Sequence, residues 1–174
     1  MKTDEFNQWS GSILQCHVDP NDPETFVVGR LLWTFADSFI LNQISPYGRW
    51  DGVAMYLLDD LTQVEKGTDY IKRLEQLLTL RHEMEPSAPA KRNDGLSTIL
   101  AYAKDCNKPV ALELYKSGNR DVIGCLSDLD DDFIRVEQLD ESGREDGITF
   151  VRRSAISRAF CGDDALTCIE LLSL

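Results

Sequence analysis

The feature that most constrains the fold of this chain is an internal repeat. When the sequence is shifted by 95 positions, Val27–Thr79 aligns with Val122–Leu174 without a gap. The motif Gly-Arg-x-Asp-Gly occurs in both copies, at 48–52 and at 143–147. Thirteen positions are identical, each with its partner 95 later: Val27, Gly29, Leu31, Asp37, Gln43, Gly48, Arg49, Asp51, Gly52, Gly67, Asp69, Glu75 and Leu77. We interpret this pattern as an internal duplication, and it favours two similar units over one large domain.

The repeat also predicts the domain boundaries. We expect residues 1–83 to form the first unit, 84–94 to form a linker and 95–174 to form the second unit. The linker contains two prolines and little apolar content, as exposed tethers do. Units of this size lie near the lower limit for burying a sufficient core alone, so each would gain from packing against its twin or another subunit.

Periodicity predicts five short strands in each unit. β-branched and aromatic residues dominate 26–35, and turn-forming residues such as Asp19–Pro23 separate the strands. Helical spacing of apolar residues appears at 67–81, 95–106 and 165–172. The expected strands are 11–18, 26–35, 39–44, 53–58, 61–65, 110–115, 121–129, 133–139, 147–152 and 155–160. We therefore expect a mainly β fold with flanking helices, built as two tandem five-stranded barrels of the SH3-like kind.

Charge limits the partners of this protein. The formal net charge is −12 and the isoelectric point is about 4.5. A surface this negative repels phosphate backbones and anionic lipids, so nucleic acid is disfavoured and no membrane partner is expected. Solubility explains such a charge, and a basic protein partner is the alternative explanation. The charged residues of Met1–Asn7 and the lack of a long apolar run predict a soluble, cytoplasmic protein.

The residues that usually carry chemistry are sparse. The five cysteines are scattered without a Cys-x-x-Cys pair, and there are two histidines, so we expect reduced thiols and no metal. Carboxylates at Asp128–Asp132 resemble a calcium loop, but Phe133 replaces its glycine and Leu139 its final glutamate, which favours a plain turn. No phosphate-binding glycine motif or catalytic triad can be proposed. We expect no cofactor, no catalytic residue and no enzymatic activity.

Two short motifs make the second unit resemble the Sm-like family. The first, an apolar residue, Gly, x, Leu, two residues, an apolar residue and Asp, is matched by Ile123–Asp130. The second, an apolar residue followed by Arg-Gly and an Ile, resembles Val151–Ile156. The resemblance covers about 96–160 and, through the repeat, about 11–65. It implies a helix followed by a bent five-stranded barrel, in a bacterial branch of the family, and association of barrels through their fourth and fifth strands.

The resemblance also implies an RNA site, and here this chain departs from the family. Asp130 and Arg152 match family positions that hold RNA bases, and they are candidate vestigial RNA-site positions. The family's asparagine is replaced by Ile134, and the glycine after Arg152 is Arg153. In the first unit, residues 35 and 57 are apolar at the positions of Asp130 and Arg152. RNA binding therefore remains an alternative function.

The repeated Gly-Arg-x-Asp-Gly motif has two interpretations. Its glycines and Asp-Gly pair are typical of a tight turn, which would set the register of a hairpin. Alternatively Arg49, Asp51, Arg144 and Asp146 form a loop that holds a ligand or partner. A related question concerns the aromatic residues at 33, 47 and 50, which the second unit lacks. They would form either a binding patch or the contact between the two units.

Taken together, the sequence favours a non-enzymatic module for self-association or protein binding. Unpaired edge strands invite such pairing, so two fused barrels would build a ring from half as many chains or close on each other. One rival hypothesis is an RNA-binding Sm-like protein. The other is an acidic immunity or antitoxin-type protein that binds a basic partner, which co-purification with that partner would reveal.

Overall fold

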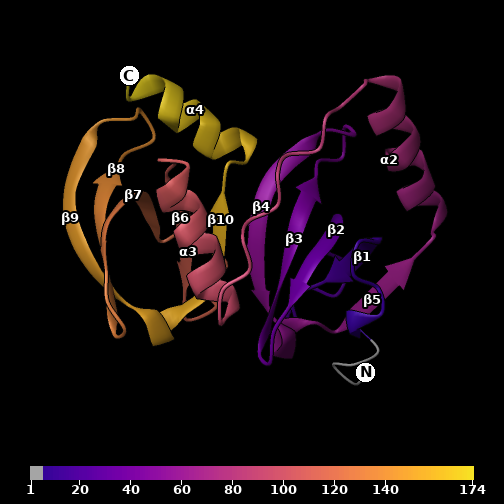
Figure 1. Ribbon diagram of the computed structural model, residues 1–174, viewed down its shortest axis with the longest axis horizontal. Helices are drawn as coiled ribbons and strands as arrows, with labels where there is room; N and C mark the ends of the chain where they lie inside the picture. The colour runs from indigo at the N-terminus through magenta and orange to yellow at the C-terminus, as the bar shows by residue number, and fades with distance from the viewer. Residues whose placement is uncertain (1–5) are drawn as a thin grey trace.

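The computed structural model describes residues 6–174 as one antiparallel sheet of ten strands accompanied by three α-helices (Figure 1). The first half contains β1 (Ile13–His17), β2 (Val27–Thr34), β3 (Ser38–Ile44), β4 (Trp50–Leu57), β5 (Gln63–Lys66) and α2 (Asp69–Leu80). The second half contains α3 (Gly95–Asp105), β6 (Val110–Leu114), β7 (Val122–Leu129), β8 (Phe133–Leu139), β9 (Glu145–Arg152), β10 (Ile156–Cys161) and α4 (Asp164–Leu172). The short 3₁₀ helices η1 (Leu58–Asp60) and η2 (Arg153–Ala155) precede β5 and β10. The expected mainly β fold with flanking helices is therefore confirmed.

The strands do not, however, form the two closed barrels that we expect from the sequence. The order in the sheet is β5-β1-β2-β3-β4-β10-β6-β7-β8-β9, and the sheet is open, with β5 and β9 at its edges. In each half the fifth strand bonds to the first, β5 to β1 and β10 to β6. The fourth strand of the first half then pairs with β10 of the second half. Because the second edge of β4 pairs with β10 of the other half, the ten strands form one continuous sheet.

Strand registers recur with the 95-residue offset. In the first half Gly29 pairs with Gln43, and in the second half Gly124 pairs with Gln138. Both β2–β3 and β7–β8 contain a register shift, after Leu31 and Leu126 respectively. The two halves thus share strand pairing and bulge positions, which is what equal spacing of apolar and turn residues produces.

The helices are capped by polar side chains and bury apolar faces. Thr68 accepts a hydrogen bond from the Ile71 N–H at the start of α2, and Asp94 accepts one from the Ser97 N–H at the start of α3. Helix α2 covers the outer face of the first half with Ile71 and Leu74. Helix α3 lies in a core cluster shared by both halves, which includes Phe35, Ile40, Val53 and Met55 with Ile99, Leu100, Val110 and Leu112. This shared core binds the two halves into one body.

Charged residues support the junction between β4 and β10. The Arg158 guanidinium lies 3.2 Å from a carboxylate oxygen of Glu113 and donates to the Val18 carbonyl at 2.6 Å. Lys116 of the second half pairs with the buried Asp60 of the first half at 2.6 Å. The contacts to Val18 and Asp60 join the two halves, and the contact to Glu113 joins adjacent strands, so the junction combines backbone pairing with paired charges.

The segment between α2 and α3 is mostly exposed, and several of its residues contact the first half. Arg30 donates two hydrogen bonds to Glu85, at 2.8 and 2.9 Å. The indole of Trp33 donates to the carbonyl of the buried Pro89 at 3.0 Å, and Lys91 lies over the Trp33 ring. Figure 1 shows the segment crossing in front of the sheet between α2 and α3. Tertiary contacts hold this segment in place although its composition is typical of a linker.

Candidate functional site

The Gly-Arg-x-Asp-Gly motif forms a turn followed by a β-bulge. The turn closes through the Ser45 N–H, which donates to the Arg49 carbonyl at 2.8 Å. Asp51 and Gly52 already belong to β4, where the register against β3 shifts between Asn42 and Ile44. Gly52 has a φ of 76°, the left-handed conformation that glycine allows in such bulges. The prediction that Asp-Gly forms the hairpin turn itself is wrong, because the strand begins before this pair.

Asp51 contacts the start of a helix in the other half. Its Oδ1 accepts a hydrogen bond of 2.9 Å from the Asp164 N–H, the first residue of α4. Burial desolvates the Asp51 carboxylate and raises its pKa, and the nearby charges of Asp163 and Asp164 act in the same direction. Arg120 offsets part of this negative charge through two hydrogen bonds to Asp163, at 3.2 and 2.6 Å. The first copy of the motif therefore makes a structural contact between the halves.

The second copy of the motif makes no such contact. Asp146 and Gly147 lie on the exposed edge strand β9, and an added Cβ on Gly147 would meet nothing within 4 Å. An added Cβ on Gly52, by contrast, would lie 2.5 Å from the Asp163 nitrogen. Arg49 and Arg144 are exposed, and within residues 6–174 neither guanidinium makes a hydrogen bond or ion pair. The four candidate loop residues thus lie in two separate places, and one of the two places is open.

β4 and β9, the fourth strands of the two halves, differ sharply in how exposed their side chains are. Val53 and Met55 of β4 are each 2% exposed, because β10 and α3 cover them. Their counterparts on β9, Ile148 and Phe150, are 55% and 67% exposed. An eight-residue edge strand with apolar side chains and free backbone groups is a typical template for pairing with another chain. We therefore regard β9, together with the opposite edge β5, as the candidate functional site.

The predicted RNA-site positions lie together at the start of β8. The Arg152 guanidinium lies 4.5 Å from the centre of the Phe133 ring. Asp130 Oδ1 accepts hydrogen bonds from the Phe133 and Asp132 N–H groups, and these bonds lower the pKa of Asp130. Ile134, at the family's asparagine position, is buried. Asp130 thus stabilises a turn, while Arg152 covers the aromatic ring beside it.

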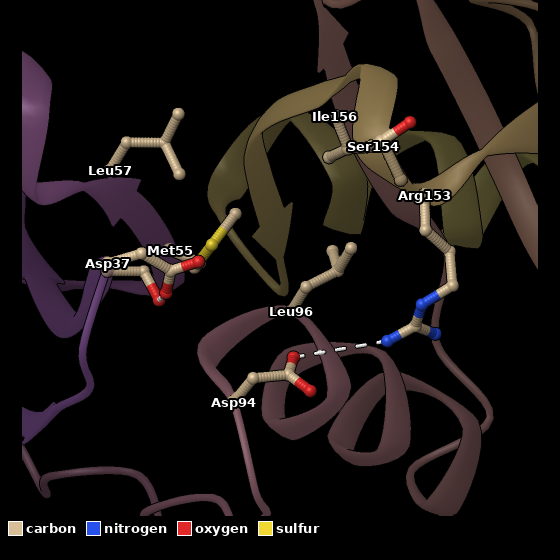
Figure 2. A pocket seen from close by; sticks show the side chains of 9 residues that line it. Asp37, Met55, Leu57, Asp94, Leu96, Arg153, Ser154 and Ile156 are labelled. Atoms are coloured by element: carbon tan, nitrogen blue, oxygen red, sulfur yellow. Dashed lines mark hydrogen bonds and ion pairs between the residues drawn. The ribbon is translucent and has the colours of Figure 1, made fainter. Parts of the chain in front are cut away.

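A cleft of about 360 Å³ opens where the two halves meet α3 (Figure 2). Arg153 enters it from η2, donates to the Ser97 hydroxyl at 2.7 Å and lies 3.9 Å from an oxygen of Asp94. Asp94 in turn caps α3. Arg153 therefore offsets the charge of Asp94, whereas the carboxylate of Asp37 accepts a hydrogen bond from the Ser38 hydroxyl. The cleft is lined by Asp37, Ser38, Met55, Leu57, Asp94, Leu96, Arg153, Ser154 and Ile156.

Sequence reasoning missed both the cleft and the Asp51 contact. Arg153 and Asp94 belong to different elements, and only the spacing Asp94-x-x-Ser97 signals that a helix cap is present. The aromatic residues divide as well: Trp33 and Trp50 are half-buried, whereas Tyr47 is exposed in the turn before β4. Trp33 packs against the shared core and the 81–94 segment, so the three do not form one surface.

Within residues 6–174 no group of three or more histidine, cysteine or acidic residues is arranged to hold a metal ion. Over the same residues no helix combines the length and apolar character needed to cross a membrane. No protein-family model, curated protein or solved structure matches this chain.

Proposed function

We propose that this protein is a non-enzymatic assembly module of the Sm-like type, duplicated within one chain, whose partner is a second copy of itself. Its β9 edge would pair with the β5 edge of the next copy, as β4 pairs with β10 inside one chain. The observation that carries the proposal is the exposure of Ile148 and Phe150 on an unpaired eight-residue strand. Natural proteins usually protect such edges, so an open one favours an intermolecular role.

The lengths of the two edges support this pairing. The β4–β10 junction contains four paired positions, from Arg158 with Tyr56 to Cys161 with Val53. Strand β5 has four residues, the number that such a junction uses. Because β9 and β5 are different surfaces, the contact is head-to-tail, and successive copies form a ring where the rotation closes.

Light scattering coupled to size-exclusion chromatography tests the proposal. We expect a mass above one chain that rises with concentration in the micromolar range. Phe150→Glu places a charge on the apolar edge and shifts the protein toward the monomer. Leu80→Glu is the matched control, because Leu80 is also 67% exposed but lies at the far end of α2, and it leaves the mass unchanged. A parent protein that stays monomeric throughout would remove the proposal.

RNA binding is a second candidate, favoured by the Arg152 guanidinium over the Phe133 ring. The net charge of −12 and the occupied carboxylate of Asp130 argue against it. Titration with labelled uridine-rich and adenine-rich RNA at low salt distinguishes the two functions. Tight binding that Arg152→Ala abolishes would favour RNA, and its absence would leave the assembly role.

A further inference from the structure

The contact between the two halves has a polar corner in addition to paired strands. Asp51 accepts a hydrogen bond from the Asp164 N–H at the first turn of α4, and Gly52 lies against the backbone of Gly162 and Asp163. A carboxylate in this position is stabilised by the unpaired N–H groups and the positive dipole end of the helix. Four residues thus form the corner: an Asp-Gly pair on β4, and a Gly and an Asp at the β10–α4 connection.

All four residues recur 95 positions away, where no equivalent contact joins them within residues 6–174. Asp146 and Gly147 lie on β9, Gly67 lies between β5 and α2, and Asp69 is the first residue of α2. No atom lies within 4 Å of a Cβ added at Gly147 or Gly67. Over residues 6–174 no acceptor contacts the Asp69 N–H, whereas its counterpart at Asp164 is bonded. The two parts of a second corner are therefore present on opposite edges of one molecule.

We infer that Asp146 of one copy accepts a hydrogen bond from the Asp69 N–H at the start of α2 in a second copy. This inference rests on the proposed edge pairing and assigns its register. Transferring the β4–β10 pairs by 95 positions places Ile148 opposite Lys66, Thr149 opposite Glu65, Phe150 opposite Val64 and Val151 opposite Gln63.

The charges around the second corner suit this contact. At the corner inside the chain, Asp51 meets Asp163 and Asp164, and Arg120 offsets their charge. At the second corner Thr68 replaces Asp163 as the helix cap, which removes one negative charge. Lys72 pairs with Asp69 at 3.0 Å, and exposed Lys66 would face the end of β9 near Asp146. With Lys66 and Lys72 nearby, the start of α2 is therefore suited to donate a hydrogen bond to the carboxylate of a second copy.

The chain allows the donor to be deleted without disturbing the helix. Asp69 is the first helical residue, a position that proline favours because its N–H has no partner within the helix. Thr68 has the extended backbone (φ −64°, ψ 160°) that a following proline requires. Asp69→Pro thus removes the N–H, and Asp69→Ala is the matched variant that removes the same carboxylate but keeps the N–H.

Sedimentation equilibrium of these full-length variants tests the inference, with circular dichroism to check that helix content is retained. We expect Asp146→Ala to weaken self-association by about 2- to 30-fold, the range of losing a helix cap. Compared with Asp69→Ala, Asp69→Pro should weaken self-association by a similar factor. When Asp69→Pro is already present, adding Asp146→Ala should not weaken self-association further. The control Asp131→Ala removes an equal charge from an exposed turn and should change the association constant by less than about twofold.

The outcomes separate the two proposals. If the parent protein self-associates but Asp146→Ala behaves like Asp131→Ala, or its effect simply adds to that of Asp69→Pro, the corner contact is refuted while edge pairing stands. If the parent protein is monomeric, edge pairing and the corner contact are refuted together. A 2- to 30-fold loss that disappears in the double variant supports both.

Discussion

The carboxylate of Asp51 accepts a hydrogen bond from the backbone N–H of Asp164, 113 positions later in the chain, at 2.9 Å. This bond joins the bulge of β4 to the first turn of α4 and so connects the two halves of the sheet. Its counterpart, Asp146, belongs to the second copy of the Gly-Arg-x-Asp-Gly motif but lies exposed on β9. The same motif therefore has two environments in one molecule, and equivalent substitutions in the two copies should change stability by different amounts.

Asp51→Ala should lower the free energy of unfolding by about 0.5–2 kcal/mol, the usual cost of losing a helix cap. Asp146→Ala is the control within the same chain, and at concentrations where the protein is monomeric it should change stability by less than about 0.5 kcal/mol. Urea denaturation followed by circular dichroism measures both. Equal losses in the two variants would show that the Asp51–Asp164 bond does not stabilise the fold.

Gly52→Ala should destabilise the protein more than Gly147→Ala. Both positions have a positive φ, 76° and 87°, which costs an alanine about 1–2 kcal/mol. At Gly52 the added methyl group also meets the backbone of Asp163 and Cys161 at 2.5 Å, so the junction must shift. Thermal unfolding at low concentration measures the difference, and similar melting temperatures for the two variants would contradict it. Gly147→Val should be destabilising through its backbone conformation alone.

The pair formed by part-buried Arg158 and buried Glu113 should show strong coupling. Removing either partner leaves a charge without its partner near the junction, at a cost of about 3–5 kcal/mol. The double variant Arg158→Met with Glu113→Gln should lose much less than the sum of the single losses. A double-mutant cycle in urea measures this coupling. Additive losses would mean that the two side chains stabilise the fold independently.

Acid should weaken the two turns that Asp130 and Asp140 support. Backbone N–H groups donate to both carboxylates and lower their pKa values. A lowered pKa in the folded state means that these groups stabilise the fold above the ordinary aspartate pKa of about 4 and lose this effect as pH falls. Asp51 has a raised pKa and contributes in the opposite direction. The melting temperature of Asp140→Asn should therefore depend less steeply on pH than that of the parent between about pH 2 and 5. An unchanged pH dependence would contradict this assignment.

Much of the local structure follows from the sequence. All ten strands occur where alternating apolar residues and turn residues predicted them, with boundaries within a few positions. Gly29 and Gln43 pair as Gly124 and Gln138 do, as expected when two segments share the same spacing of apolar and turn residues. β4 begins at Trp50, three residues before its predicted start, because a bulge at Asp51–Gly52 resembles a turn in sequence.

The candidate site was predicted only in part. Arg49, Asp51, Arg144 and Asp146 were expected to form equivalent loops, yet burial separates Asp51 from the other three. The docking of 81–94 through Glu85 and Pro89 has no periodic pattern that would reveal it, since it depends on Arg30 and Trp33 in distant strands. Contacts of this kind depend on which surfaces meet, and local patterns do not encode that.

The sequence pattern alone predicts the ten strands and the three described helices, because side-chain periodicity and turn chemistry act over a few residues. The pairing of β4 with β10 and the open edges β5 and β9, by contrast, depend on tertiary packing. The physical reason is that strand edges present the same backbone N–H and C=O groups whatever their sequence. Which edges meet depends on the packing around them, here on α3 and on the bond between Asp51 and the first turn of α4.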